Sequence, residues 1–317
     1  MILAALAALA LVAASPEPRS GEASRNAARR GTADVRVIAA GDVGCDPTEP
    51  AYNDGAGSGF QCRMRATSDL WVGDDTVDAV LGIGDLQEES GTLEEYREVY
   101  RPTWGRGKEI TFPAIGNHDY KTPGAAGYFA YWKSQADPVR EDSAWYSFDL
   151  GTWHLLTLDS NCREVGCGST SAQGEWLARD LRRNEARCTL AYFHHPALAS
   201  TGTGVMSIPT SVSFLKRLHR SGVDVLLVAH HHAYERFAPL DGSLAVDAAH
   251  GVRQFVVGTG GASTAPQTHV APHSRVRVRA PGVLDLRLRD GSYRWRFLTI
   301  AGEVADRGTA DCVDPAA

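Results

Sequence analysis

The sequence predicts a mixed α/β fold, and two features of its pattern carry that prediction. Short apolar runs of four to six residues, rich in β-branched or aromatic side chains, recur along the chain and run into polar loops. Such runs are typical of buried strands. Longer stretches with apolar residues at helical spacing lie between them. Strands that alternate with helices favour an α/β architecture.

Five of the apolar runs are the expected buried strands. They span residues 35–40, 79–83, 110–115, 189–193 and 225–229. Helices are expected at residues 92–100, 172–183 and 212–221. In the last two, apolar side chains recur on one face, namely Trp176, Leu177 and Leu181 and then Phe214, Leu215 and Leu218. We interpret these faces as core packing.

Two hairpin signals interrupt this alternation. Residues 145–150 and 153–158 flank Gly151-Thr152, and residues 283–288 and 293–298 flank Asp290-Gly291, a strong hairpin turn. Antiparallel pairs beside parallel strands predict mixed sheets. The sequence contains no visible internal repeat, so one domain over residues 34–317 is the expected organisation.

Composition narrows the class of protein without naming a reaction. Of the 317 residues, 22% are charged and 43% are hydrophobic, which argues against a disordered chain and against a membrane bundle. The net charge of −6 differs from the positive charge that is typical of nucleic-acid-binding proteins, so no nucleic-acid partner is expected.

The first residues have the pattern of an export signal. Residues 1–14 are one apolar run, shorter than the ~20 residues that span a bilayer. Val12 and Ala14 suit positions −3 and −1 of a cleavage site. Residues 15–33 are expected to be a disordered linker. We therefore expect a secreted protein with no membrane association after cleavage; the alternative for residues 1–14 is a buried helix.

The six cysteines suit an exported chain, in which an even number favours disulfides. Cys162 and Cys167 bracket a short loop, and Cys45 and Cys62 flank a loop rich in Gly and Asp. Local pairing of each is expected, which leaves Cys188 to pair with Cys312. The alternative is buried free thiols.

Metal-binding side chains follow all five predicted strands. They are Asp42, Asp85, Asn117-His118-Asp119, His194-His195 and His230-His231-His232. Ligand sites of open α/β sheets lie beyond the carboxyl ends of strands. Carboxylate and imidazole together suit zinc, manganese or iron, and paired ions lie ~3.5–4 Å apart in two-metal sites. One His after a strand would be read as a core residue. Five such ends indicate a metal site, because charged groups are costly to bury without partners.

These motifs resemble those of the calcineurin-like metallophosphoesterases and, within them, the purple acid phosphatases. The motifs are Gly41-Asp42-Val43-Gly44, Gly84-Asp85, Gly116-Asn117-His118-Asp119, Phe193-His194-His195-Pro196 and residues 229–236 (AHHHAYER), in the family's order. The resemblance implies a four-layer fold, with two mixed β-sheets face to face and helices outside. It implies a short bacterial type without the amino-terminal sandwich domain of larger members.

The resemblance also implies the ligands of two metal ions. Asp42, Asp85 and His232 would hold the first ion. Asp85 would bridge to the second, which Asn117, His194 and His230 would also hold. The ions would be iron, zinc or manganese, and a hydroxide between them would attack the phosphorus of a phosphate ester.

Neighbours of these ligands receive supporting roles from the same resemblance. Asn117 and His118 are expected to contact the substrate, and His118 to protonate the leaving group; the alternative is that His118 only orients a ligand. Asp119 is expected to orient an imidazole. His195 and His231 alternate in direction with the ligands, so we expect them behind the site or in packing.

Two other segments have structural interpretations. Tyr234, Glu235 and Arg236 are expected to form an ion-pair element behind the site. Residues 258–261 (GTGG) follow a strand, and they either line the pocket or form a simple Gly-rich turn.

The chain departs from the purple acid phosphatase pattern at three places. Ala229 replaces the Gly before the paired histidines, which crowds the turn. Residues 197–209 contain no His, so the family's substrate-loop histidines have no counterpart. Glu88 stands where a Tyr binds ferric iron. Two interpretations of Glu88 stay open: a metal ligand, or a side chain that points to solvent like Glu89 and Ser90.

The predicted function is hydrolysis of small phosphate monoesters by a secreted enzyme with two metal ions. The first alternative is a phosphodiesterase that acts on cyclic nucleotides or nucleic-acid ends, because the same metal site serves both. The second is a protein that binds metal or phosphate without turnover. The presence of both Asn117 and His118 argues against the second, because a metal holder needs no His that faces a substrate.

Overall fold

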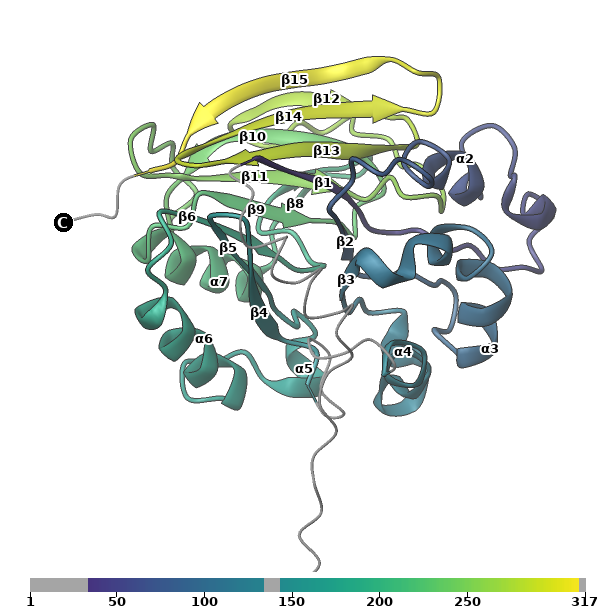
Figure 1. Ribbon diagram of the computed structural model, residues 1–317, viewed down its shortest axis with the longest axis horizontal. Coiled ribbons are helices and arrows are strands. Elements are labelled where there is room, and N and C mark those ends of the chain that lie inside the picture. The colour runs from purple at the N-terminus through teal and green to yellow at the C-terminus, as the bar shows by residue number, and fades with distance from the viewer. Residues whose placement is uncertain (1–33, 134–142, 314–317) are drawn as a thin grey trace, which may run out of the picture.

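All five apolar runs form strands in the structure, a computed structural model that describes residues 34–133 and 143–313 (Figure 1). The expected signal segment (residues 1–14) and linker (15–33) lie outside the described residues. The strands are β1 (Asp34–Ala40), β2 (Ala79–Ile83), β3 (Thr111–Ala114), β6 (Cys188–Tyr192) and β9 (Val225–Val228). Every residue of β2, β6 and β9 is buried, as continuous apolar runs predict.

The first sheet has six strands in the order β15-β14-β13-β1-β2-β3. It includes the predicted hairpin β13 (Gly282–Arg289) and β14 (Ser292–Thr299), to which β15 (Val304–Asp311) adds an edge strand. β1, β2 and β3 run parallel, whereas β13 lies antiparallel to β1. The sheet is therefore mixed, as expected.

The second sheet has seven strands in the order β12-β10-β11-β9-β6-β5-β4. The predicted hairpin β4 (Tyr146–Leu150) and β5 (Trp153–Thr157) forms one edge. β5, β6, β9 and β11 (Val252–Val257) run parallel, and β10 (Tyr234–Leu240) and β12 (Ser274–Val278) complete the sheet in antiparallel pairs. A two-stranded ribbon joins β7 (Ala199–Ser200) and β8 (Val205–Met206).

Helices flank both sheets (Figure 1). α6 (Ala172–Arg183) and α7 (Pro209–Arg220) lie where helices were predicted. The predicted helix at 92–100 is a short α3 (Leu93–Glu95) that continues as the π-helical turn η2 (Tyr96–Tyr100). The other helices and helical turns are α2 (Met64–Ser68), α4 (Ala126–Trp132), α5 (Cys162–Val165), η1 (Asn53–Gly55), η3 (Trp104–Ile110), η4 (Asp119–Lys121) and η5 (Pro123–Ala125).

Two hydrophobic clusters hold these layers together. One contains side chains of both sheets, where Tyr234 of β10 stacks on Phe297 of β14 with 4.1 Å between ring centroids. The other lies between the second sheet and α6 and α7, and it includes Leu177, Phe214 and Leu218. The apolar helix faces are thus core faces. The fold is the predicted one, two mixed sheets with helices outside.

Three disulfides tie loops to this frame, in the pairs expected from the sequence. They join Cys45 to Cys62, Cys162 to Cys167 and Cys188 to Cys312. The last joins the start of β6 to the residue that follows β15, so it fixes the end of the first sheet to the second. Within residues 34–133 and 143–313, no helix has the length and apolarity needed to cross a membrane.

Candidate metal centre

Side chains from both sheets meet where their parallel strands end. The loops after β1 and β2 in the first sheet carry Asp42 and Asp85, and the loops after β6 and β9 in the second carry His194, His230 and His232. Nε2 of His194 lies 2.9 Å from Oδ2 of Asp85 and 3.9 Å from Oδ1 of Asp42. The loop after β3 joins them, because the backbone N–H of His118 donates to Asp85 Oδ1 at 2.8 Å. Packing the two sheets face to face therefore brings all five predicted strand ends to one place.

Three overlapping groups of potential ligands lie within this cluster, and one of them, Asp85, Glu88 and His118, shares residues with the other two. Asp85, His194 and His230 form the first of those two, in which each residue offers an atom within 4.8 Å of the others. Asp42, Glu88 and His232 form the second by the same measure. Nε2 of His232 lies 3.6 Å from Asp42 Oδ1 and 3.4 Å from Glu88 Oε1. The geometry thus offers two neighbouring cation sites.

Several oxygen atoms of this cluster are buried and accept no hydrogen bond. They include both carboxylate oxygens of Asp42, Oε1 of Glu88 and Oδ1 of Asn117. Buried polar atoms are nearly always satisfied, since an unpaired one costs free energy. Cations bound at the two neighbouring sites would satisfy these atoms. The donor set of carboxylate, amide oxygen and imidazole therefore fits metal ions such as zinc, manganese or iron.

Two of the histidines are oriented so that one nitrogen faces the cluster. Nδ1 of His194 lies 3.0 Å from the backbone carbonyl oxygen of Ile83, to which it donates. Nδ1 of His232 lies 3.3 Å from Oγ of Ser263. In both rings the contact at Nδ1 fixes the ring so that Nε2 points into the cluster, where it could bind a metal ion on losing its proton.

The charges of the cluster perturb one another strongly. Burial raises the pKa of Asp42 to about 7. Burial opposes ionisation of Asp85 as well, but the His194 charge and hydrogen bond hold that pKa below its usual range. Burial would lower the pKa of His232, yet Asp42 and Glu88 raise it to about 10. Burial lowers the pKa of His230 to about 3. Such shifts are typical of functional sites.

Backbone strain is concentrated at the same strand ends. Asp42, Asp85 and His230 have φ angles of 54°, 46° and 67°. Residues other than Gly rarely adopt this left-handed backbone conformation. A strained residue persists only where the surrounding structure enforces it. The left-handed conformation directs three side chains toward the cluster, and its strain lowers the stability of the fold.

His118 lies at the edge of the cluster and is partly open to solvent. Its backbone N–H donates to Asp85 Oδ1 at 2.8 Å, and its Nδ1 lies 2.9 Å from the carbonyl oxygen of Glu89. Its Nε2 is 4.0 Å from Asp85 Oδ2, and 19% of the side chain is exposed. With Nδ1 occupied, Nε2 is the atom available to a substrate.

Glu88 does not point to solvent, and that interpretation of the sequence is wrong. Its residue exposure is 7%, and its carboxylate belongs to the group with Asp42 and His232. Its neighbour Glu89 behaves as the sequence suggests, because its side chain is 49% exposed and pairs with Lys121. The remaining interpretation, in which Glu88 is a ligand, agrees with the geometry.

Asp119 has a different partner from the one expected. Its carboxylate accepts hydrogen bonds from the Tyr96 hydroxyl at 2.7 Å and from the Gly116 N–H at 2.9 Å, and it bonds no imidazole among the described residues. Burial raises its pKa to about 8. The expectation that Asp119 orients a histidine is therefore wrong; it braces the loop that carries Asn117 and His118.

His195 and His231 lie beside the ligand groups and belong to none of them. Nδ1 of His195 bonds Ser160 Oγ at 2.8 Å, and its ring lies 4.5 Å from that of His230. His231 is buried, and burial lowers its pKa to about 4. His195 supports the ring of His230 and His231 is packed, which agrees with the supporting roles expected from alternation.

Two segments around the site have clear structural roles. Tyr234 and Arg236 both bond Asp306, and Glu235 bonds the backbone N–H of Ser200 at 2.7 Å, so this element is structural as expected. At Gly258, a Cβ would come within 2.3 Å of Asp42 Oδ2. Residues 258–261 are thus a close support for Asp42, a role between the two weighed from the sequence.

Ala229 lies against Gly41, where a Cβ would come within 2.6 Å of the Ala229 Cβ and 2.7 Å of the backbone carbonyl oxygen of Ile83. The backbone contact alone requires a glycine at position 41, and that glycine also leaves room for the methyl group of Ala229. The supporting residues Ser160 and Ser263 were missed by sequence reasoning. Neither belongs to a motif, and only the folded chain brings them to His195 and His232.

Comparison with known proteins agrees with this geometry. The family model described as calcineurin-like phosphoesterase matches residues 35–234. Purple acid phosphatase 23 of Arabidopsis thaliana is 30% identical over 159 residues, covering 44% of this chain and 34% of that protein. Acid phosphatase type 7 of Danio rerio is 26% identical over 210 residues, covering 57% and 46%. The chain thus spans less than half the length of these curated relatives.

A solved structure agrees at the level of the fold. Purple acid phosphatase PPD1 from yellow lupin (Lupinus luteus) seeds superimposes with a TM-score of 0.71 at 20% identity, covering 88% of this chain and 54% of that one. The matched region of the family model, residues 35–234, contains the six ligands that the family resemblance implies, from Asp42 to His232, and Glu88 as well. The chain belongs to the calcineurin-like phosphoesterase family, within which it resembles the purple acid phosphatases.

Proposed function

We propose that this protein hydrolyses phosphate monoesters at a centre of two metal ions. The observation that carries the proposal is the pair of adjacent ligand groups whose buried oxygens have no hydrogen-bond donor. Buried oxygens without a hydrogen-bond donor lower the stability of the fold, so they are not expected unless a ligand binds there. Two bound cations would offset the buried negative charges and would account for the strained backbone at the residues that carry the ligands.

The ligands divide between the two ions as follows. Asp42, Glu88 and His232 would hold the first, and Asn117, His194 and His230 the second, with Asp85 between them. Asp85 suits the bridging position because its carboxylate belongs to one group with His194 and His230 and to another with Glu88, which are proposed ligands of different ions. When bound, the ions would lower the pKa of a water molecule and neutralise charge on the phosphate oxygens.

The chain's own residues would position the ester and supply a proton. Nε2 of His118 faces the cluster from its solvent-exposed edge, where a substrate would arrive. The Glu89 carbonyl fixes the ring through Nδ1. His118 would therefore contact a phosphate oxygen and donate a proton to the departing alkoxide, which contributes ~10²–10⁴-fold in such reactions.

The donor set indicates which metals the centre would take. Glu88 offers a carboxylate where the purple enzymes have a phenolate, so the first site would suit zinc, manganese or ferrous iron. A ferric ion is not required by this ligand set. We propose a colourless enzyme on this ground.

One assay separates the candidate functions. Purified protein would be loaded in turn with Zn²⁺, Mn²⁺ or Fe²⁺, its metal content measured, and its turnover compared on an aryl phosphate monoester and the matching diester. The proposal expects two ions per chain and faster turnover of the monoester. Faster turnover of the diester would make the protein a phosphodiesterase. Two ions without turnover of either would make it a binding protein.

We also propose that the protein is exported. All six cysteines are in disulfides, and disulfides persist in oxidising compartments. Expression in a bacterial host with a tagged carboxyl terminus tests this. The tagged protein should appear outside the cytoplasm, with its amino terminus at residue 15. An intact Met1 in the cytoplasm would contradict export.

A further inference from the structure

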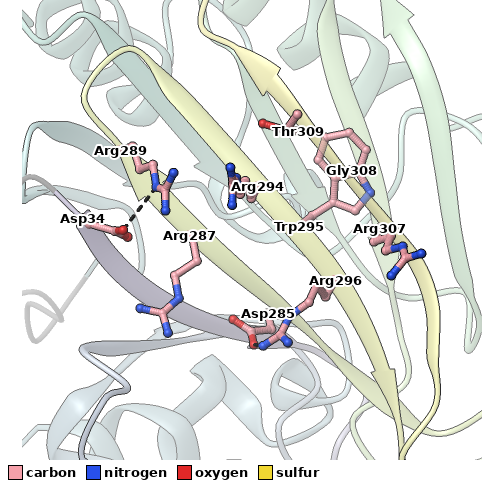
Figure 2. Close-up of a pocket in the computed structure, with 10 residues that line it drawn as sticks. All are labelled: Asp34, Asp285, Arg287, Arg289, Arg294, Trp295, Arg296, Arg307, Gly308 and Thr309. Atoms are coloured by element: carbon pink, nitrogen blue, oxygen red, sulfur yellow. Dashed lines mark hydrogen bonds and ion pairs between the residues drawn. The ribbon is translucent and has the colours of Figure 1, made fainter.

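The outer face of β13, β14 and β15 carries a hollow of about 800 Å³ that is lined with arginines (Figure 2). Apolar side chains of these strands, such as Leu286 and Phe297, are buried on the other face. Side chains alternate between the faces of a strand, so the arginines gather on one side. They are Arg287, Arg289, Arg294, Arg296 and Arg307, against the two carboxylates of Asp34 and Asp285.

The register of the strands places like charges directly opposite one another. Arg287 pairs with Arg294 across β13 and β14, and Arg296 pairs with Arg307 across β14 and β15. On β1, Arg36 lies opposite Arg287 in turn. Like charges at opposed positions destabilise a sheet. Asp285 offsets part of this repulsion through its ion pairs with Arg36 and Arg296. Among the described residues, Arg287, Arg294 and Arg307 have no such partner, and an anion bound over the face would offset the remaining repulsion.

The carboxylates near the arginines already form ion pairs. Asp34 pairs with Arg289 at 3.1 Å, as Figure 2 shows, and Asp285 pairs with both Arg36 and Arg296. In the described part of the chain, Arg287, Arg294 and Arg307 have no carboxylate within ion-pair distance. Arg294 and Arg307 are exposed and Arg287 is half-buried. Three guanidinium groups are thus available in a protein whose net charge is −6.

We propose that this arginine face binds inorganic polyphosphate, a linear anion with repeating phosphate groups. A guanidinium group binds phosphate with two parallel N–H···O bonds. The arginines are spread over three strands, with Cα spacings of ~5 Å across strands and ~7 Å along them. A single phosphate could reach only part of that area, whereas a chain of phosphates can contact several arginines at once and gains affinity from each. The inference is independent of the proposed function.

Fluorescently labelled inorganic polyphosphate of about 45 units is a suitable probe, with binding measured at several salt concentrations. The double variant Arg294→Gln/Arg307→Gln removes two exposed, unpaired arginines. It should bind at least about tenfold more weakly, since hydrogen bonds to charged groups are individually strong. Its salt dependence should also fall, because each lost phosphate contact removes ~0.7 from the slope for a flexible chain. Hydrolysis of an aryl phosphate should be unchanged.

The matched control is Arg182→Gln/Arg183→Gln, which removes the same charge from two exposed positions at the end of α6. Its affinity for polyphosphate should stay within about twofold of the unmodified protein. Equal weakening by both double variants would reduce the effect to net charge and overturn the proposal. Undiminished binding by the Arg294/Arg307 variant would place the polymer elsewhere, and binding to phosphatidylglycerol vesicles in place of polyphosphate would assign the face to a membrane surface.

Discussion

Oε1 of Glu88 lies 3.4 Å from Nε2 of His232, and Oδ1 of Asp42 lies 3.6 Å from the same nitrogen. The two carboxylates come from loops after neighbouring parallel strands, and the imidazole comes from the other sheet. Glu88 is buried and Oε1 accepts no hydrogen bond. Two buried carboxylates this close together need positive charge beside them, which the protonated His232 supplies in this structure and a bound metal ion would supply in its place.

Glu88→Ala should therefore lower the occupancy of one of the two metal ions and leave the other in place. Activity should fall at least about tenfold, as it does when support of a metal site is lost. Metal content after dialysis is the measurement. The control is Glu89→Ala, which removes an exposed carboxylate one residue away and should keep both ions. Two ions retained by Glu88→Ala would contradict its role as a ligand.

The spectrum of the protein tests the same residue in another way. A carboxylate ligand gives no visible charge-transfer band, whereas a tyrosinate bound to ferric iron does. The protein loaded with iron in air should therefore show no purple band. A band that disappears on reduction would mean that a Tyr fills the position assigned to Glu88, and the first ligand group would need revision.

Asp85→Asn should remove most activity and lower the occupancy of both ions, because Asp85 is expected to contact both. The side chain keeps its size and loses only its negative charge. Elemental analysis and turnover of an aryl phosphate measure the two effects. Asp75→Asn is the control, since Asp75 is exposed, and it should change neither quantity. Loss of only one ion in Asp85→Asn would show that Asp85 does not bridge.

The sequence predicts the parts of this site that depend on local pattern. The runs that form β2, β6 and β9 are recognisable in the sequence because they are almost entirely apolar, as buried strands are. The candidate ligands follow directly after them. The division of those ends between two sheets came from the family resemblance alone. Local pattern could not reveal that Glu88 turns inward toward His232, because its neighbours Glu89 and Ser90 look like solvent-facing residues.

Asp119 shows the same limit. Its position after Asn117 and His118 suggests an orienting role, but its carboxylate is taken by Tyr96, 23 positions earlier in the chain. That contact depends on how η2 packs against the loop after β3. Interactions between distant segments of this kind carry no signature in a single sequence, whereas strands and ligand-bearing loops do.

His118→Ala should leave both ions bound and slow hydrolysis by ~10²–10⁴-fold if His118 is a general acid. The loss should be smaller for nitrophenyl esters than for alkyl phosphates, because a nitrophenolate leaves without help from a proton. Rates on both substrates with unchanged metal content measure this. Equal losses on both substrates would assign His118 to phosphate binding alone.

The disulfide between Cys188 and Cys312 should contribute most to stability. It closes a loop with a sequence separation of 124 residues, for which the chain-entropy model gives about 4–5 kcal/mol. The double variant Cys188→Ala/Cys312→Ala should lower the free energy of unfolding in urea by about that amount. Cys162→Ala/Cys167→Ala, with a separation of 5, should cost only about 2 kcal/mol. Equal losses would contradict the loop-length argument.

His154 should make stability depend on pH, far from the candidate metal centre. Its Nδ1 lies 2.9 Å from Asp149 and its Nε2 lies 2.9 Å from Asp180. Both nitrogens can donate only when the ring is protonated. Burial alone would lower the pKa of His154, but the hydrogen bonds to Asp180 and Asp149 outweigh burial and raise it above the usual value.

A raised pKa in the folded state means that folding favours the protonated ring. The resulting stability is fully present below the unfolded pKa of about 6.5 and is lost as the pH rises through the folded pKa. His154→Gln should therefore lower the free energy of unfolding more at pH 5.5 than at pH 9, measured by urea denaturation of the unmodified protein and the variant. His250→Gln, on a side chain that is 51% exposed, is the control and should show little difference between the two pH values. An equal cost of His154→Gln at both pH values would mean that the ring is neutral and that its two carboxylate contacts are not charge-assisted.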